Sequence, residues 1–267
     1  MSAPAYGRYQ VAEPYSALAK LHRHTGETLQ VVHHEPKVGV LDQSDLAAQG
    51  IDVSSFIPGA PAGVDALGSC TANATTAAIS NLLSESDFLG ATGASSYADT
   101  KSAEEFAIRF YHQCTDQTGD TSTEWPPTDC GSSGPFIVSE LEAMKLASGD
   151  KIANTATDIV SLLQSDGILI GSPWFYAWES PDANGFIDVG GISAAIASGV
   201  AGGHETYWWG VDKLTLNDDG NVDPTKTIII GRNRWGESWG DAGNYRTYLS
   251  TFMAIASHCD WRQLVAA

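Results

Sequence analysis

The chain is poor in basic residues and in long apolar runs. Lys and Arg number 14 of 267 residues against 32 Asp and Glu, which gives a formal net charge of −18. A surface this acidic repels phosphate backbones and anionic lipids, so we predict neither a nucleic-acid nor a membrane partner. The chain also lacks a run near 18 apolar residues and a signal-peptide pattern at its start. We expect a protein of the cytoplasm or of a larger particle, and its oligomeric state is open.

Cysteine is scarce as well, with Cys70, Cys114, Cys130 and Cys259. Four cysteines are too few for a disulfide scaffold at this length. No Cys-x-x-Cys pair occurs, and the paired histidines His22 with His24 and His33 with His34 have no cluster of Cys or carboxylates beside them in sequence. We therefore predict no metal site and no cofactor.

What the chain does contain is enough apolar material for a large core. Apolar residues make up 43%, with 8 Trp and 9 Tyr. Helical spacing predicts helices over residues 70–83, 102–113, 136–146 and 154–164. Runs of β-branched and aromatic residues predict strands over 168–178, 205–214, 226–235 and 244–249. Helices followed by strands indicate an α+β fold with two lobes.

The domain organisation follows from this order of elements. Residues 1–40 are polar and mixed, which predicts an arm that packs on the rest. We expect one domain over residues 41–267, with a helical lobe at about 41–165 and a β-rich lobe at about 166–267.

Cys70 begins a run of small and apolar residues at helical spacing, after Gly68 and Ser69. A thiol at a helix N-terminus has a lowered pKa, because the unpaired backbone N–H groups favour the thiolate. A cysteine in this position is equally often a small buried apolar residue. Cys70 is therefore a candidate nucleophile that needs a partner.

Two residues of the strand-rich half supply candidates for that partner. His204 follows two glycines directly before an aromatic strand, and Asn233 lies at the end of another strand, ahead of Trp235. A thiol is activated by a nearby imidazole whose ring is oriented by a third group. We predict Cys70 as nucleophile, His204 as base and Asn233 as the residue that orients the histidine.

Here the sequence resembles a known family. Leu67–Ala74 (LGSCTANA) looks like the nucleophile segment of the papain family of cysteine peptidases, of which this chain looks like a divergent member. Asn233–Tyr245 (NRWGESWGDAGNY) resembles that family's Asn-Ser-Trp-Gly-x-x-Trp-Gly-x-x-Gly-Tyr signature, with one residue inserted before the tyrosine. Gly203 and His204 stand where the family has its catalytic histidine. The resemblance covers roughly residues 40–250.

The resemblance implies a two-lobe papain-like fold with the active site in the cleft between the lobes. It implies a thiol protease, a hydrolase that cleaves the peptide bonds of a peptide or protein substrate without a cofactor. Cys130–Phe136 (CGSSGPF) is similar to the family segment whose backbone lines the cleft, although the residues alone fit a turn before a helix equally well. The implied cleft residues are Ser132, Ser133, Gly134, Gly203 and Trp235.

Two departures from the family pattern bear on activity. The family has a glutamine six residues before the nucleophile as an oxyanion donor, and Val64 stands there. The backbone N–H of Cys70 still serves, and Gln43 and Gln49 are upstream candidates for the side-chain donor. The family's cysteine three residues before the nucleophile is Leu67, so we expect Cys130 to pair with Cys114 in an oxidising compartment.

Two other functions stay open for the same residues. In a transamidase or ligase, the acyl group held on Cys70 is transferred to an amine instead of to water. The sequence does not distinguish this transfer from hydrolysis. Because the usual glutamine is missing, the chain also fits a papain-fold protein that is catalytically weak or inactive and has a binding or structural role.

Overall fold

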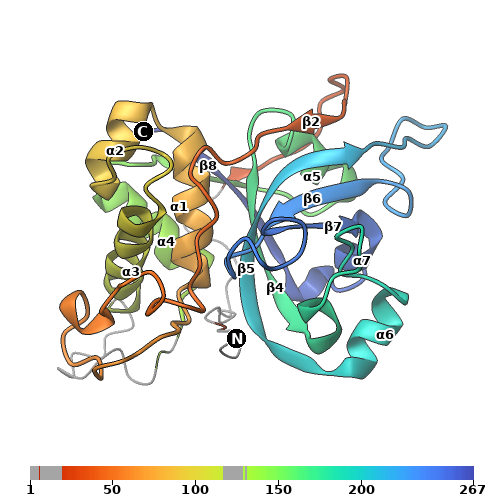
Figure 1. Ribbon diagram of the computed structural model, residues 1–267. Helices are drawn as coiled ribbons and strands as arrows, with labels where there is room; N and C mark the ends of the chain where they lie inside the picture. Colours follow the sequence, from red (N-terminus) through yellow and green to blue (C-terminus); the bar gives the residue numbers. More distant parts are fainter. Residues whose placement is uncertain (1–5, 7–19, 117–128, 130) are drawn as a thin grey trace.

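The computed structural model describes residue 6, residues 20–116, residue 129 and residues 131–267. Four helices gather on one side of the molecule and the strands with three further helices on the other (Figure 1). This is the α+β arrangement that the order of elements predicts.

The helices have the following bounds: α1 Cys70–Leu82, α2 Glu85–Thr92, α3 Thr100–Asp116, α4 Gly134–Ala143, α5 Ala156–Leu162, α6 Gly191–Ser198 and α7 Leu249–Met253. Short 3₁₀ turns cover Val53–Ser55, Tyr176–Glu179 and Ala256–His258. The strands are β1 Lys20–Leu21, β2 Val32–His33, β3 Gly149–Ile152, β4 Ile168–Phe175, β5 Val200–Lys213, β6 Ile228–Arg232, β7 Asn244–Tyr248 and β8 Asp260–Val265.

Among the described residues, the strands form one sheet in the order β1-β3-β8-β4-β5-β6-β7, and β2 pairs with β5. The long strand β5 runs antiparallel to both β4 and β6, with His204 opposite Ser172. The last strand, β8, lies between β3 and β4, so the C-terminus returns to the helical side. The sheet therefore joins β1 and the C-terminal strand β8 to the middle of the chain through β3 and β4.

Helix α1 is the central helix, and its composition explains how it is buried on nearly all sides. Eleven of its 13 residues are buried. Many are alanines, which let neighbouring backbones approach closely. The hydroxyls of Thr75 and Thr76 donate to the carbonyls of Thr71 and Ala72 one turn back, so these polar groups are satisfied inside the helix. Consequently α1 packs against both α3 and β5.

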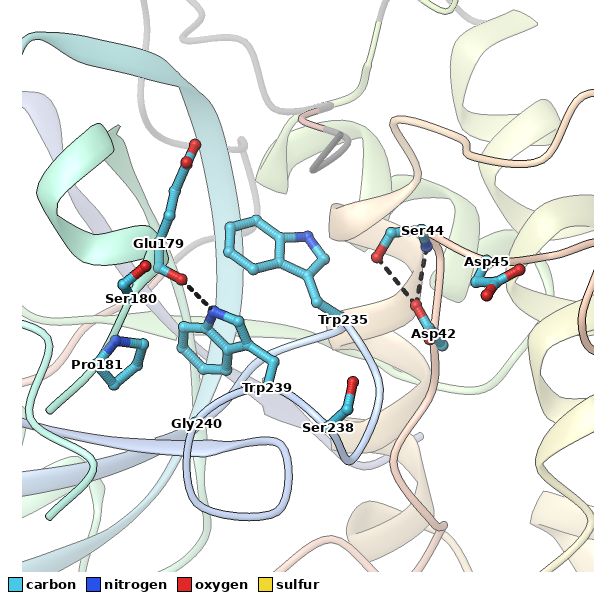
Figure 2. A pocket seen from close by; sticks show the side chains of 10 residues that line it. All are labelled: Asp42, Ser44, Asp45, Glu179, Ser180, Pro181, Trp235, Ser238, Trp239 and Gly240. Carbon is cyan, nitrogen blue, oxygen red and sulfur yellow. Dashed lines mark hydrogen bonds between the residues drawn. The ribbon is translucent and has the colours of Figure 1, made fainter. Parts of the chain in front are cut away.

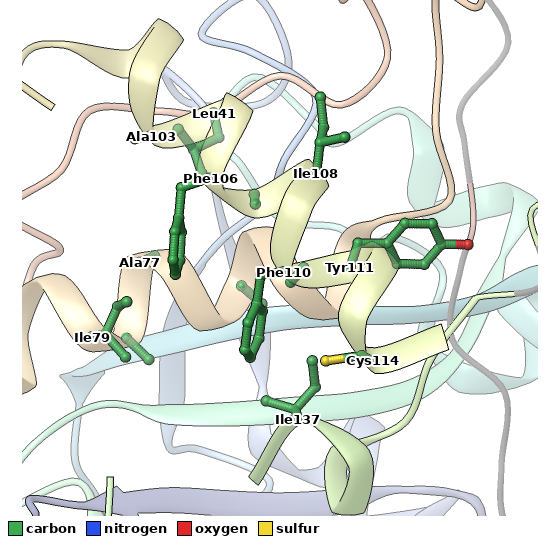
Figure 3. Packing of buried hydrophobic residues seen from close by; sticks show 14 of the residues in the cluster. Leu41, Ala77, Ile79, Ala103, Phe106, Ile108, Phe110, Tyr111, Cys114 and Ile137 are labelled. Carbon is green, nitrogen blue, oxygen red and sulfur yellow. The ribbon is translucent and has the colours of Figure 1, made fainter. Parts of the chain in front are cut away.

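The core of the helical side lies between α1, α3 and α4 (Figure 3). Phe106 and Phe110 of α3 stack with ring centroids 5.7 Å apart. Cys114 lies at the end of the same helical face, completely buried. It is a free thiol in this structure. Cys130 lies outside the described residues, so the Cys114–Cys130 disulfide expected in an oxidising compartment stays a prediction. The thiol takes part in the apolar core, and burial raises its pKa.

A second core fills the sheet side with aromatic rings. Trp174, Trp178, Trp208 and Phe252 are buried there, and Trp208 donates its indole N–H to Tyr245 at 2.8 Å. Leu169 and Tyr207 of the sheet nevertheless belong to the helical core. The two sides therefore share a packed interface, and the domain boundaries expected from the sequence stay a prediction.

The predicted helices and strands are confirmed, with shifted ends. Helix α4 begins at Gly134 and not at residue 136, and strand β4 ends at Phe175, where a 3₁₀ turn takes over. Helices α2, α6 and α7, and strands β1, β2, β3 and β8, were not predicted. Helices α2 and α6 have eight residues each, and the other elements are two to six residues long. The strands among them pair with segments that are distant in sequence.

None of the described helices is both long and apolar enough to cross a lipid bilayer. Within the described ranges, no group of three or more His, Cys, Asp or Glu side chains is arranged to hold a metal ion.

Candidate active site

Cys70 is the first residue of α1 and is completely buried. Its N-cap, Ser69, donates its hydroxyl to the Asn73 side-chain oxygen at 2.7 Å instead of capping the helix. The first N–H groups of α1 thus keep the partial positive charge that favours a thiolate at this end of the helix.

His204 lies on β5, the strand that packs against α1, and Asn233 follows β6 beside it. The His204 Nε2 atom lies 2.7 Å from the Asn233 side-chain oxygen. The backbone N–H of Arg234 also donates to that oxygen, at 2.8 Å, which fixes the orientation of the amide. Because the oxygen only accepts, Nε2 carries the proton of the neutral ring.

The other ring nitrogen of His204 is left as a base. Nδ1 is buried and has no hydrogen-bond partner among the described residues. In a neutral imidazole with the proton on Nε2, this nitrogen holds a lone pair. The structure therefore brings His204 and Asn233 together as predicted from the sequence, and it leaves Nδ1 ready to take a proton.

Aromatic rings enclose this hydrogen bond. The Trp235 ring stacks on His204 with centroids 4.9 Å apart and 26° between the planes, and Trp174 approaches edge-on at 4.9 Å. Tyr6 covers another side of the imidazole at 5.8 Å, touches Trp235 at 5.7 Å and donates its hydroxyl to Glu179. The rings exclude water from the His204–Asn233 bond.

Burial also changes the acidity of the imidazole. It lowers the pKa of His204 to about 4, and the hydrogen bond to Asn233 opposes this only in part. In this closed arrangement the ring is neutral at neutral pH. A thiolate–imidazolium pair with Cys70 then requires that the imidazole regain contact with water or with a charged partner.

A buried carboxylate joins the segments around the site. Glu104 of α3 accepts from the Asn73 side chain at 2.5 Å and from the backbone N–H of Asp42 at 3.1 Å. The Arg234 guanidinium, also completely buried, interacts electrostatically with both Glu104 and Cys70. Burial raises the pKa of Glu104 to about 7 and lowers that of Arg234 to about 9.

The structure distinguishes between the two upstream glutamines. Gln43 is buried, and its side chain donates to the Leu67 carbonyl at 3.0 Å while Leu67 N–H donates to the Gln43 carbonyl. The Gln43 N–H in turn donates to the Arg234 carbonyl. The amide of Gln49 instead donates to the carbonyls of Asp42 and Asp45 in a local turn. Gln43 is therefore the glutamine beside the Cys70 and Asn233 segments.

The predicted cleft residues fall in different surroundings. Ser132 and Ser133 are buried at the start of α4, and a Cβ on Gly134 would meet Arg262 at 2.3 Å. Gly203 pairs with Pro173 in the sheet. Trp235 lines an open cavity of about 460 Å³ (Figure 2). Of the five, Trp235 alone lines this cavity, and the role of the others as a peptide-binding cleft stays a prediction.

The sequence did not identify three residues that lie near the site: Tyr6, Glu104 and Arg234. A signal existed for Glu104, since it lies four and seven residues before the buried Ile108 and Tyr111 and so shares their helix face. A carboxylate on an apolar face indicates a buried polar network. Tyr6 carried no such signal.

No model of a known protein family matches the chain, and no curated protein matches it. Solved structures do. Xylellain, a cysteine protease from Xylella fastidiosa, is 15% identical, with all of this chain and 97% of that chain covered and a TM-score of 0.50. Procathepsin L 3 of the Tenebrio molitor larval midgut is 13% identical over 92% of this chain and 74% of that one, with a TM-score of 0.44. The likeness to xylellain, which spans the whole chain, gives a papain-like fold.

The first prediction concerns Glu104. Its pKa is about 7 when folded and near 4.5 when unfolded, so between these pH values the folded protein holds a proton that the unfolded chain has lost. The free energy of unfolding therefore falls by roughly 3 kcal/mol as the pH rises through this range. Glu104→Gln, which resembles the protonated acid, removes this fall. Urea unfolding from pH 4.5 to 7.5 measures it.

Glu105→Gln is the matched control, because Glu105 is the half-exposed neighbour on the same helix. It keeps the pH dependence of the wild type. A Glu104→Gln protein whose stability follows the wild-type curve would contradict a buried carboxylate at this position.

The second prediction concerns Tyr6. Tyr6→Ala uncovers one side of the His204 ring, so the pKa of His204 rises from about 4 toward its ordinary 6.5. Tyr6→Phe keeps the ring and loses only the hydroxyl to Glu179, so it leaves that pKa low. Histidine ring NMR across a pH titration measures the pKa of His204 in both variants. An unchanged pKa in the Ala variant would mean that other groups bury the imidazole.

Proposed function

We propose that this chain, which has the papain-like fold, is a cysteine-type peptidase that hydrolyses peptide bonds. The observation that carries the proposal is the His204–Asn233 hydrogen bond, held under Trp235 on the strand that packs against the helix headed by Cys70. A helix-terminal thiol facing an oriented imidazole is the arrangement that thiol catalysis requires.

The chemistry uses only side chains of this chain. His204 takes the thiol proton at Nδ1, and the Cys70 thiolate attacks the peptide carbonyl, whose oxygen becomes an oxyanion. The C–N bond breaks as the imidazolium gives that proton to the leaving amine. Water, deprotonated by His204, then attacks the thioester carbonyl carbon. The C–S bond breaks, the acid is released, and the Cys70 sulfur takes the proton back from the imidazolium. Asn233 keeps the ring in one orientation throughout.

The oxyanion needs two donors, and we assign the side chain of Gln43 to the second. The first is the backbone N–H of Cys70 at the start of α1. Gln43 is buried against Leu67, three residues before Cys70, and against Arg234, one residue after Asn233. Residues 44–66 form the loop that connects Gln43 to Leu67. This position supports Gln43, not Val64, as the functional equivalent of the family's glutamine.

Substrate reaches this site only after a rearrangement. Cys70, His204 and Asn233 are all completely buried, and Tyr6 packs on the imidazole. We propose that departure of Tyr6 exposes His204 to substrate, raises its pKa and so allows the thiolate–imidazolium pair to form.

Labelling of Cys70 tests the proposal directly. Iodoacetamide at pH 6, with mass mapping, modifies Cys70 of the wild type at least about tenfold faster than Cys70 of His204→Ala, because the imidazole supplies the thiolate. His258→Ala, an exposed histidine, is the control and leaves the rate unchanged. An equal labelling rate of Cys70 in the wild type and in His204→Ala would favour a binding or structural protein, since no activated thiol would exist.

Substitution of the glutamines tests the oxyanion assignment. Gln43→Ala lowers kcat for a peptide substrate by about 10²–10³ and changes KM little, because the lost bond forms only in the transition state. Gln49→Ala, which removes an amide from a surface turn, lowers kcat less than about twofold. Thermal melts verify that both variants fold. Equal effects of the two substitutions would remove Gln43 from the oxyanion hole.

A further inference from the structure

An open cavity lies beside the candidate active site, and we call it the tryptophan pocket. Its volume is about 460 Å³, and ten residues line it, among them Asp42, Asp45, Glu179, Trp235 and Trp239. The two indoles meet at right angles with centroids 5.4 Å apart and form the wall between the acids (Figure 2). The volume admits one long amino-acid side chain together with the backbone next to it.

The charge of this pocket has one sign. Glu179 lies on one side of the indoles, and Asp42 and Asp45 lie on the other (Figure 2). None of the ten described lining residues is Lys, Arg or His. Burial raises the pKa of Asp42, which means that its anion is poorly solvated. A cation brought into the pocket would restore the lost solvation and gain from the faces of the two indoles.

An unused donor lies in the wall of this pocket. Trp235 is 6% exposed, and its indole N–H has no hydrogen-bond partner among the described residues. Figure 2 shows this nitrogen turned toward the gap that separates Trp235 from Ser44. A buried N–H without a partner is costly unless a ligand oxygen reaches it, and a peptide carbonyl is such an oxygen. The pocket therefore offers one site for a backbone carbonyl and another for a cation.

The position of the pocket indicates which half of the substrate it receives. Trp235 both lines the pocket and stacks on His204, the group that protonates the departing amine. Asp42 and Ser44, on the opposite wall, flank Gln43 in the chain. A peptide with one side chain in the pocket and its backbone along Trp235 therefore presents its amine end to the imidazole. That end is the leaving-group side of the scissile bond.

We propose that the tryptophan pocket binds a lysine or arginine side chain on the leaving-group side of the peptide substrate. Asp42 and Asp45 attract the cation, the indoles of Trp235 and Trp239 pack on its aliphatic stem, and the Trp235 N–H donates to a backbone carbonyl. This assignment rests on the proposed peptidase function and names the substrate class that the site prefers: peptides with a basic residue just beyond the cleaved bond.

Internally quenched peptides test this preference. The acyl side is randomised, and the first residue of the leaving side is Lys, norleucine or Glu. Norleucine has the four-carbon stem of lysine without its ammonium group. For wild type we expect kcat/KM about tenfold higher with Lys than with norleucine, lower still with Glu, and a Lys preference that shrinks with added salt.

The double variant Asp42→Asn with Asp45→Asn keeps the side-chain oxygen of residue 42 to which Ser44 donates, and it removes both charges. Its preference for Lys falls to about twofold or less. The control is Asp87→Asn with Asp218→Asn, which changes the net charge equally at two exposed residues outside the pocket and keeps the wild-type preference. Equal use of Lys and norleucine by the wild type, or an undiminished preference in the double variant, overturns the proposal.

Binding separates a failure of this assignment from a failure of the proposed function. The same peptides are titrated onto the full-length Cys70→Ala protein, with tryptophan fluorescence as the readout. If no peptide is hydrolysed by the wild type, the peptidase proposal fails. Tighter binding of the Lys peptide that disappears in the Asp42→Asn, Asp45→Asn background still upholds the pocket, and equal binding of the Lys and norleucine peptides refutes it.

Discussion

The arrangement of the site depends on one buried carboxylate. Glu104 of α3 holds Asn73, one turn after Cys70, and the backbone of Asp42, next to Gln43. Its charge also faces Arg234, which follows Asn233. Three chain segments that are far apart in sequence are thereby fixed against each other in the interior. A carboxylate without solvent is costly, so this group specifies the geometry at the expense of stability, and its raised pKa measures that cost.

Burial has two opposite effects on the candidate catalytic residues. The rings of Trp174 and Trp235 exclude water from the His204–Asn233 hydrogen bond, which keeps the imidazole in one orientation. The same dry environment depresses the pKa of His204 and so keeps the ring neutral. With Tyr6 in place, the imidazole is therefore held in one orientation but uncharged. Under the proposed function, substrate entry changes the solvation of the imidazole as well as uncovering it.

The loop of residues 44–66 shows where spacing along a sequence fails as a guide. Counting six residues back from Cys70 reaches Val64, which packs at the edge of the helical core. Gln43 lies 27 residues before Cys70, yet it exchanges hydrogen bonds with Leu67. A long surface loop costs little conformational entropy beyond a short one, so an insertion can separate two interacting residues without moving either. Contact in the fold, and not distance in the chain, decides which glutamine lies beside the Cys70 segment.

The sequence by itself determined the fold class and the main helices and strands, and it named Cys70, His204 and Asn233 as candidates, because these depend on local periodicity and on short motifs. The pairing of His204 with Asn233 was predicted, and the tertiary structure supplied its geometry. Only the tertiary structure decided the role of Glu104, the cover by Tyr6, the free thiol of Cys114 and the cavity at Trp235. Each of these depends on packing between segments distant in the chain, and local sequence carries no information about which distant group will fill a neighbouring space.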